Sequence, residues 1–436
     1  MFGYYFDLAL RSFRRNKVLT ALMVLAIALG IGASMTTLTV FHVLSGDPLP
    51  GKSDRVFYPQ LDPRSMNGYS EGEDPSFQMT RFDAEALLRD GRGKRQALMT
   101  AGHVAVEPKR SGLEPFIASA RFTSADFFPM FEAPMLYGSP WTGPQDERRE
   151  RVAVISTELN DRLFEGRDSV GETIQLDQHD FQIVGVMDRW RPTPRFYDVT
   201  SSRFGNVEQV FVPFSTARDV DFSTSGSMGC WGDANNDPEG QRGLNAPCTW
   251  LQYWVELESA NDADDYLAYL TNYSDQQRAN GRYERPTNVR LHDVMGWLDH
   301  NQVVPSDVRL QTWLALGFLL VCLVNTVGLL LAKFLRRSSE IGVRRALGAS
   351  RRAIFAQCLV EAGTVGLAGG VLGLGLALLG LWAVRQQPVG YASLAHLDGT
   401  MLVTTFVLAI VASLVAGLLP AWRACQVTPA IQLKSQ

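Results

Sequence analysis

One stretch of the sequence has the residue types and spacing of a phosphate-binding loop. GDPLPGKS at 46–53 fits the pattern GxxxxGK[ST]. In nucleotide-binding proteins this loop joins a strand to a helix and turns backbone N–H groups toward phosphate. Here it follows a long apolar segment, and Pro48 and Pro50 remove two N–H donors. We therefore predict a turn at 46–53 and no nucleotide site.

The five cysteines divide into two groups. Cys230 and Cys248 lie in the polar middle of the chain, on either side of a loop rich in Gly, Asn and Asp. In an oxidising compartment they are the plausible pair, and a bridge there would stabilise the fold by about 3 kcal/mol in the chain-entropy model. A redox or zinc site needs closer spacing or further ligands. The other cysteines lie in or beside apolar segments: Cys322, Cys358 and Cys425.

The six histidines give no catalytic or metal-binding pattern. His292 and His300 are near one another, but no HExxH, Ser/His/Asp or metal-ligand spacing accompanies them. We therefore predict no catalytic residue and no metal site in this chain.

Long uncharged runs determine the class of protein. They span 18–46, 310–332, 362–384 and 399–422. A membrane-spanning helix needs about 20 mostly apolar residues. We therefore predict four transmembrane helices at 18–44, 310–332, 362–384 and 399–422. Such a composition excludes a soluble protein, a disordered chain and a nucleic-acid binder.

The charge is unevenly distributed along the chain. Residues 45–309 carry 27 Lys and Arg against 41 Asp and Glu, whereas the rest of the chain carries 14 against 4. Because basic residues stay on the cytoplasmic side of membrane helices, the orientation follows. We predict a cytoplasmic N-terminal segment at 1–17, a periplasmic domain at 45–309 and a short periplasmic loop at 385–398. The cytoplasmic parts further along are 333–361 and the tail 423–436.

The segment 45–309 has mixed secondary-structure signals. Alternating or apolar runs predict strands at 151–156, 174–176, 181–187, 207–213 and 250–257. Residues 157–164 are typical of a helix start, and helical spacing predicts a helix at 263–280. The predicted fold is therefore an α-helical membrane protein with four transmembrane helices and a large α+β extracytoplasmic domain of two lobes.

The third apolar run carries two overlapping small-residue patterns. They are Gly366-xxx-Gly370 and Gly369-xxx-Gly373, which let another helix backbone approach closely. We predict that this helix packs tightly against the fourth.

The basic segment between the second and third apolar runs is the most specific part of the sequence. It reads RRSSEIGVRRALGASRR at 336–352. Ser339 can cap a short helix, Glu340 stands four residues before Arg344, and Gly348 can end the helix. The segment is either a rigid lever for a cytoplasmic partner or a basic loop that only fixes the topology and contacts anionic lipid. The residues in question are Glu340, Ile341, Gly342, Val343, Arg344, Arg345, Ala346, Leu347 and Gly348.

These segments together resemble the permease subunits of MacB/FtsX-type ABC transporters. EIGVRRALGAS at 340–350 is similar to the cytoplasmic signature of that family, and LVNTVGLLLAKFLRR at 323–337 fits the stretch before it. The two ends of the chain also match the family, with ALRSFRRNKVLTALMVLAIALGIG at 9–32 and GLLPAWRACQVTPAIQL at 417–433. Residues 124–187 are similar to its periplasmic core domain.

The resemblance implies a homodimer or heterodimer in the bacterial inner membrane, with helix 340–348 docking on an ABC ATPase. ATP and Mg²⁺ would bind that ATPase, which we expect to be a separate chain, so this chain by itself is no enzyme and binds no cofactor. The implied function is export of a drug, peptide or other amphiphile with a periplasmic adaptor and an outer-membrane channel. The alternative is a non-transporting signalling permease like FtsX, or a lipoprotein extractor.

Overall fold

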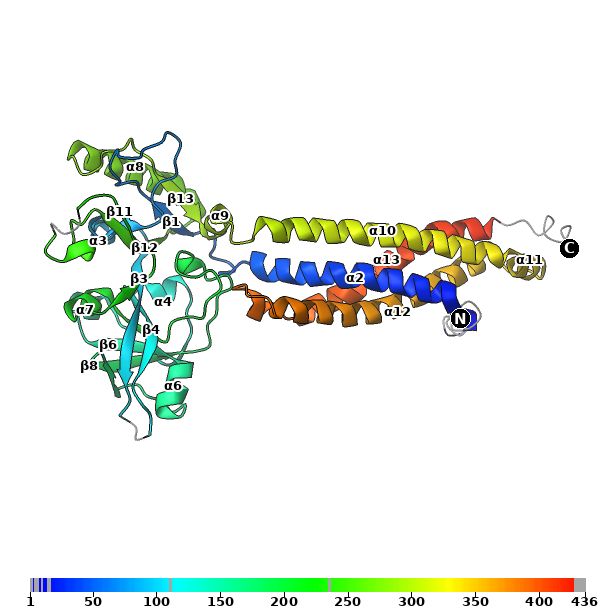
Figure 1. Cartoon of the computed structure of the whole chain (residues 1–436), viewed down its shortest axis with the longest axis horizontal. Helices are drawn as coiled ribbons and strands as arrows, with labels where there is room; N and C mark the ends of the chain where they lie inside the picture. The colour runs from blue at the N-terminus through cyan, green and yellow to red at the C-terminus, as the bar shows by residue number, and fades with distance from the viewer. Residues whose placement is uncertain are drawn as a thin grey trace. The chain divides into compact units, whose positions relative to one another are not determined.

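The computed structural model describes residues 3, 8, 11–13, 17–109, 112–233 and 237–426 (Figure 1). Arg14, Arg15 and residues 427–436, which belong to the predicted cytoplasmic ends, lie outside the described residues. The chain divides into two compact units. Unit 1 comprises residues 1–45 and 304–436, and unit 2 is Gly46–Val303.

Unit 1 is built on four long helices. Each is long and apolar enough to cross a membrane. They extend beyond the predicted spans because polar and charged residues at the ends of an apolar run still continue the helix. Their bounds are α2 Lys17–Ser45, α10 Ser306–Arg336, α12 Arg351–Arg385 and α13 Gly399–Cys425.

The predicted connection at 333–361 is almost entirely helical. After α10 ends at Arg336, a short helix, α11, spans Ser338–Ala346, and α12 already begins at Arg351. Gly348 adopts a φ of 99°, a left-handed conformation that glycine reaches without strain. Ser350 caps α12, its Oγ accepting a hydrogen bond from Ala353 N at 3.2 Å. The predicted cap at Ser339 is wrong, because Ser339 lies inside α11.

The long helices include two charged residues that lie beyond the predicted spans. Those spans stop at 332 and begin again at 362, so neither contains an ionisable residue. In the structure Lys333 lies inside α10 and Glu361 inside α12, and both are buried.

The two glycine patterns of α12 face different helices. A Cβ at Gly366 or Gly370 would meet Ser413 or Ala409 of α13, at 2.0 and 2.8 Å. A Cβ at Gly369 or Gly373 would instead meet α2, at 2.6 and 3.0 Å. The predicted packing against the fourth helix, α13, therefore holds for Gly366 and Gly370. Gly369 and Gly373 pack against the first long helix, α2. Helix α12 lies between α2 and α13.

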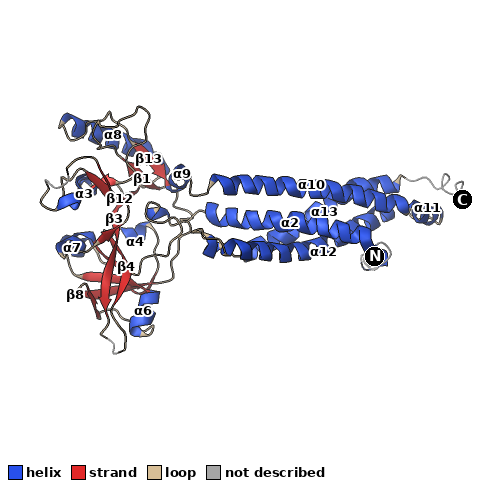
Figure 2. Cartoon of the chain, viewed as in Figure 1, coloured by secondary structure: helices blue, strands red, loops and turns tan. Residues whose placement is uncertain are grey.

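Unit 2 is an α+β domain organised around one extended sheet (Figure 2). In the described residues the strand order is β13-β1-β12-β3-β4-β9-β6-β8-β5. Four short strands pair beside this path: β2, β7, β10 and β11. The two predicted lobes share this sheet, so unit 2 is one compact unit. Strands along the main path are β1 Val56–Gln60, β3 Arg95–Glu107, β4 Phe116–Thr123, β5 Met135–Gly138, β6 Val152–Ser156, β8 His179–Met187, β9 Val210–Pro213, β12 Cys248–Glu256 and β13 Arg290–Asp293.

The remaining elements of unit 2 are short strands and helices that cover the sheet or connect its strands. Ser156 begins α6 as its N-cap, with its Oγ accepting from Leu159 N at 3.2 Å. Their bounds are β2 Met79–Thr80, β7 Thr173–Leu176, β10 Thr224–Ser225, β11 Gly229–Cys230, α3 Arg81–Asp90, α4 Phe127–Met130, α5 Gly143–Glu147, α6 Thr157–Phe164, α7 Phe214–Asp219, α8 Ala263–Ala279 and α9 Val294–His300.

Each face of the sheet has its own hydrophobic core. Successive side chains of a strand point to opposite faces, so neighbours along β1 and β3 fall into different clusters. Phe57 and Leu98 belong to one core, whereas Tyr58 and Met99 belong to the other. A sheet buried on both faces explains why its strands are apolar runs rather than strict alternations.

Candidate functional site

Helix α11 is the predicted coupling helix, and the structure ties its polar groups to the rest of unit 1. Arg344 Nη2 forms an ion pair with Glu340 Oε1 at 2.9 Å, and Arg344 Nη1 donates to Gln357 Oε1 of α12 at 3.1 Å. Arg345 Nη1 donates to Cys425 O at the end of α13 at 3.2 Å. Both arginines thus hold α11 on its own subunit.

The outer face of α11 carries exposed apolar side chains. Val343 is 53% exposed and Leu347, just after the helix, is 84% exposed. They stand four residues apart, so they lie on one face. Ala346 is exposed beside them. Gly342 is buried and Ile341 packs on the helical core of unit 1, so these two predicted site residues face inward.

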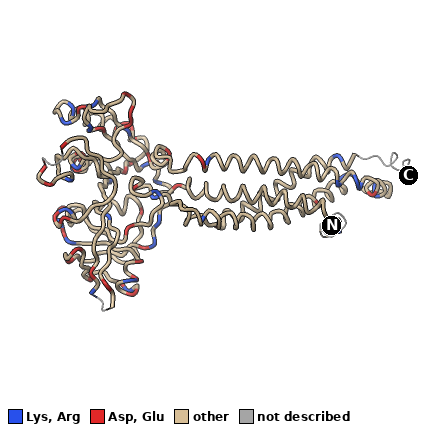
Figure 3. The backbone as a smooth tube through the Cα atoms, in the orientation of Figure 1, with Lys and Arg blue, Asp and Glu red and all other residues tan. Residues whose placement is uncertain are grey.

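Basic residues gather at the end of the bundle where α11 lies (Figure 3). The middles of the four helices are almost free of charge in the same view. An exposed apolar pair surrounded by polar groups is a pattern typical of interface centres.

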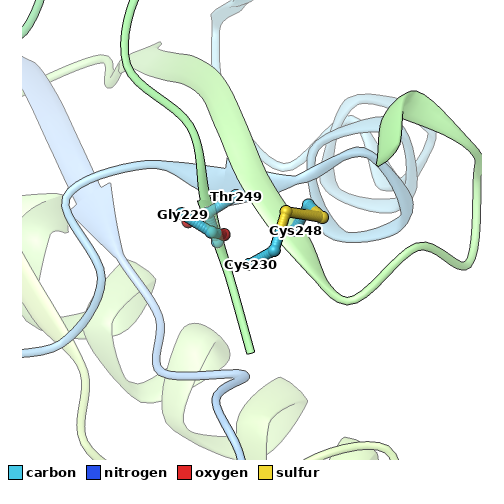
Figure 4. The surroundings of a disulfide bond; sticks show 4 residues. All are labelled: Gly229, Cys230, Cys248 and Thr249. Atoms are coloured by element: carbon cyan, nitrogen blue, oxygen red, sulfur yellow. A yellow bond between two sulfur atoms is a disulfide. The ribbon is translucent and has the colours of Figure 1, made fainter. Parts of the chain in front are cut away.

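The two cysteines predicted to pair are bonded in the structure. Cys230 of β11 and Cys248 of β12 are opposite each other in the antiparallel ladder, with their Cα atoms 4.1 Å apart (Figure 4). The next pair along the ladder is Gly229 and Thr249. Residues 234–236 of the enclosed loop lie outside the described residues. The bond joins a short strand to a central one. The three free cysteines are buried in unit 1: Cys322, Cys358 and Cys425.

The segment that fits a phosphate loop is a turn with other contacts. It follows α2 and leads into β1, so neither the preceding strand nor the following helix of a nucleotide-binding loop is present around residues 46–53. Lys52 Nζ donates to Pro129 O at 3.0 Å and lies 3.5 Å from Glu256 Oε2. Ser53 Oγ donates to Asp47 Oδ2 at 2.7 Å. The side chains that would hold phosphate and metal are thus used within the domain.

The two histidines noted in the sequence stack on each other, with ring centroids 4.8 Å apart. Burial, followed by the charges of His300 and Arg290, lowers the pKa of His292 below its usual 6.5. Within the described residues no group of three or more His, Cys, Asp or Glu side chains is placed to hold a metal ion.

A buried charge cluster in unit 2 was not predicted. Arg121 of β4 is fully buried, and its Nη2 donates to Asp198 Oδ2 at 2.7 Å and to Glu208 Oε1. Arg195 Nη1 reaches the same Glu208 oxygen at 3.0 Å, and Tyr197 donates its hydroxyl to Glu208 Oε2 at 2.9 Å. Burial raises the pKa of Asp198, but Arg121 and Arg195 outweigh it and hold the pKa at about 2. Asp198 therefore stays ionised at neutral pH, and the contacts of this cluster fix 195–208 on the sheet.

The buried Lys333–Glu361 pair was not predicted from the sequence either. A usable signal existed, because Glu361 is the single acidic residue between 341 and 397, next to an apolar run. Burying an ionisable group in such a place costs free energy, so its presence indicates a functional role.

Comparison with known families identifies both parts of the chain. The model of the MacB-like periplasmic core domain matches residues 20–273, and the model of the FtsX-like permease C-terminal region matches residues 313–429. The first match alone covers more than half of the 436 residues. Together they cover the N-terminal helix, most of unit 2 and the three later helices.

Similar curated proteins combine ATP-binding and permease parts in their names. The pyoverdine export ATP-binding/permease protein PvdT of Pseudomonas aeruginosa is 24% identical over 97% of this chain and 57% of its own length. The macrolide export ATP-binding/permease protein MacB of Azoarcus sp. is 26% identical over 70% of this chain and 40% of its own. The chain thus spans about half the length of the curated relatives it matches.

Two solved structures align with part of this chain. The periplasmic region of MacB from Actinobacillus actinomycetemcomitans aligns with 59% of this chain and 98% of its own, with 12% identity and a TM-score of 0.36. The extracellular domain of the noncanonic ABC-type transporter YknZ aligns with 54% of this chain, with 12% identity and a TM-score of 0.35. From the two family models, we conclude that this chain belongs to the MacB/FtsX-type permeases of the ABC transporter class.

Proposed function

We propose that this chain is the membrane subunit of an ATP-driven complex, and that a nucleotide-binding domain in a separate chain docks on α11. The observation that carries the proposal is the exposed pair Val343 and Leu347 beside two arginines, Arg344 and Arg345, that are engaged within unit 1. Because α11 is joined directly to α10 and α12, a displacement of α11 moves two membrane helices. ATP and Mg²⁺ belong to the docked domain.

The proposed orientation places α11 and both termini in the cytoplasm and unit 2 in the periplasm of a bacterium, with the helices in the inner membrane. The support is the gathering of Lys and Arg at the α11 end of the bundle (Figure 3). Close packing at the glycines of α12 supports transmission of motion through the bundle rather than passage of a substrate between its helices.

The docking face can be tested by adding a charge at its centre. Leu347→Asp and Val343→Asp should each lower recovery of the partner ATPase with the chain from mild detergent, since an unpaired carboxylate in an interface core is costly. Val170→Asp is the matched control, because Val170 is also exposed and apolar but lies in unit 2. Wild-type recovery of ATPase with both α11 variants would show that this face is not the docking surface.

Export is the proposed outcome of this motion. Curated relatives of this chain are named for export of pyoverdine and of macrolides. We therefore propose an amphiphilic substrate released with a periplasmic adaptor and an outer-membrane channel. Identification of the proteins that co-purify with the chain tests this, because an adaptor supports export, whereas a cell-wall hydrolase or a sensor kinase supports signalling and a lipoprotein supports extraction.

A dimer is the second part of the proposal. Asn325 lies in the middle of α10 and is exposed in the single chain. Gly317 and Gly328 of α10 are exposed too, and both face open space. A lone amide facing lipid is unfavourable, whereas amides and small residues often meet at helix–helix contacts in membranes. Disulfide cross-linking of Asn325→Cys in membranes tests for a second copy, and a heterodimer would instead give a cross-link to a related permease carrying its own cysteine.

A further inference from the structure

Glu361 of α12 is the centre of a buried polar cluster at the α11 end of unit 1. Lys333 Nζ of α10 forms an ion pair with Glu361 Oε1 at 2.7 Å, and Arg337 Nη1 lies 3.5 Å from both carboxylate oxygens. Ser12 Oγ donates to Glu361 Oε1. Lys333 Nζ also lies 3.5 Å from Thr20 Oγ1 of α2. We refer to these five residues as the Glu361 cluster.

The cluster is not explained by stability alone. The Lys333 side chain is fully buried and that of Glu361 is 5% exposed. Taking two such charges out of water costs more than their attraction commonly returns, and an apolar pair of similar volume is often equally stable. A buried ion pair of this kind instead fixes one arrangement of the helices that carry it.

The arrangement that it fixes is the position of α11. Arg337 is the residue between α10 and α11, at the end of one helix and the start of the other. Gln357, which accepts from Arg344 of α11, stands four residues before Glu361 on the same face of α12. Two contacts on one stripe of α12 therefore hold both the beginning and the middle of α11. The same carboxylate binds the N-terminal segment through Ser12.

We propose that Glu361 is a positioning residue, which acts through Arg337 and Lys333 to keep α11 fixed relative to α2, α10 and α12. With the cluster intact, a displacement of α11 moves these helices together. Without it, the junctions on either side of α11, at 337 and 347–350, absorb the displacement. The inference rests on the proposed docking of an ATPase on α11.

The design of the test separates positioning from stability. Glu361→Gln leaves two buried or half-buried cations without a counter-charge, so it lowers stability as well. The double variant Lys333→Met with Glu361→Gln removes both members of the pair at similar volume and should recover the thermal stability of the wild type. Lys333→Arg keeps the charge and should behave like wild type. Thr326→Val, in a buried position of α10 outside the cluster, is the matched control.

The first readout uses the purified chain alone. Spin labels at Ser339 of α11 and Lys17 of α2, both exposed, report the distance between the two helices. We expect one narrow distance distribution for the wild type, Lys333→Arg and Thr326→Val, and a broad one for Glu361→Gln and the double variant. Wild-type distributions in the double variant would overturn the positioning role, whatever binds α11.

The second readout is stimulation of the partner ATPase by the permease in lipid vesicles. The double variant should retain its fold, but its stimulation of ATP hydrolysis should be at least about fivefold lower than that of the wild type. Fivefold is the lower end of the typical coupling between two sites. If the wild type itself gives no stimulation, the docking proposal fails while the spin-label result stands. If the double variant stimulates like wild type, the inference about Glu361 fails while docking stands.

Discussion

Arg121→Met is the sharpest test of the unit 2 structure. The substitution removes a fully buried cation, and among the described residues Arg195 is then the guanidinium that still pairs with the carboxylates of Asp198 and Glu208. Removing one partner of a buried ion pair costs about 3–5 kcal/mol, because the other charge stays buried and uncompensated. At about 1.4 kcal/mol per tenfold change, local opening should become roughly 100-fold to several thousand-fold more frequent.

Amide hydrogen exchange of the full chain in detergent measures this locally. Arg121 of β4 is paired with Phe211 of β9 in the parallel ladder, so the amides of these two strands should lose protection first. Arg149→Met is the control, since Arg149 pairs with Asp219 on the surface, where an ion pair contributes about 0–1 kcal/mol. Exchange of β4 and β9 within about threefold of wild type would refute the reasoning, since that change is below 1 kcal/mol.

The same cluster predicts a pH dependence with a definite sign. The pKa of Asp198 is held at about 2 in the folded chain, below the usual value of about 3.9 in an unfolded one. Its contribution to stability is therefore complete above about pH 4 and is lost as the pH falls toward 2. In Arg121→Met the loss of stability should begin at higher pH, because Arg121 lowers the pKa of Asp198 more than Arg195 does.

Three further predictions concern other parts of the molecule. Gly373→Leu should lower the thermal stability of the protein in detergent by about 1–3 kcal/mol through overpacking against α2, whereas Gly375→Leu, which faces open space, should not. Because the pKa of His292 lies below 6.5 in the folded state, the unfolding free energy of unit 2 should fall as pH drops through 6.5, and His292→Gln should flatten that curve in a denaturant titration. Mass spectrometry without reduction should find Cys230 linked to Cys248 in protein from an oxidising compartment, and two free thiols there would contradict the bridge.

Local sequence patterns predicted the four long helices and part of unit 2, but they did not predict β1, β3 and β4 or the contacts between elements. Uncharged runs predict the four long helices, because a membrane span depends on the length of one continuous segment. RVAVIS at 151–156 and the helix after it also match β6 and α6, since both signals are local. Charged residues just outside an apolar run were read as its flanks, which is why Lys333 and Glu361 were placed outside the spans.

Contacts between distant residues needed the three-dimensional structure. Arg121 and Asp198 are 77 residues apart, and Ser12 and Glu361 are 349 apart. Nothing in either segment alone indicates its partner. The inward orientation of Gly342 and the outward orientation of Leu347 depend on how α11 lies on α12, which helical spacing cannot determine when both faces of a short helix contain apolar residues.

The two glycine tracks of α12 restrict the ways in which this helix can move. One track touches α13 and the other touches α2, and each touches a neighbour at distances that leave no room for a side chain. Turning α12 about its axis by one residue, about 100°, would bring Leu372 or Val371 into those places. Rotation is therefore blocked, and sliding along the axis would also move the glycines out of these contacts, whereas tilting together with α2 and α13 keeps them in place. A 35-residue helix, about 52 Å long, is thus restricted to moving together with its two neighbours.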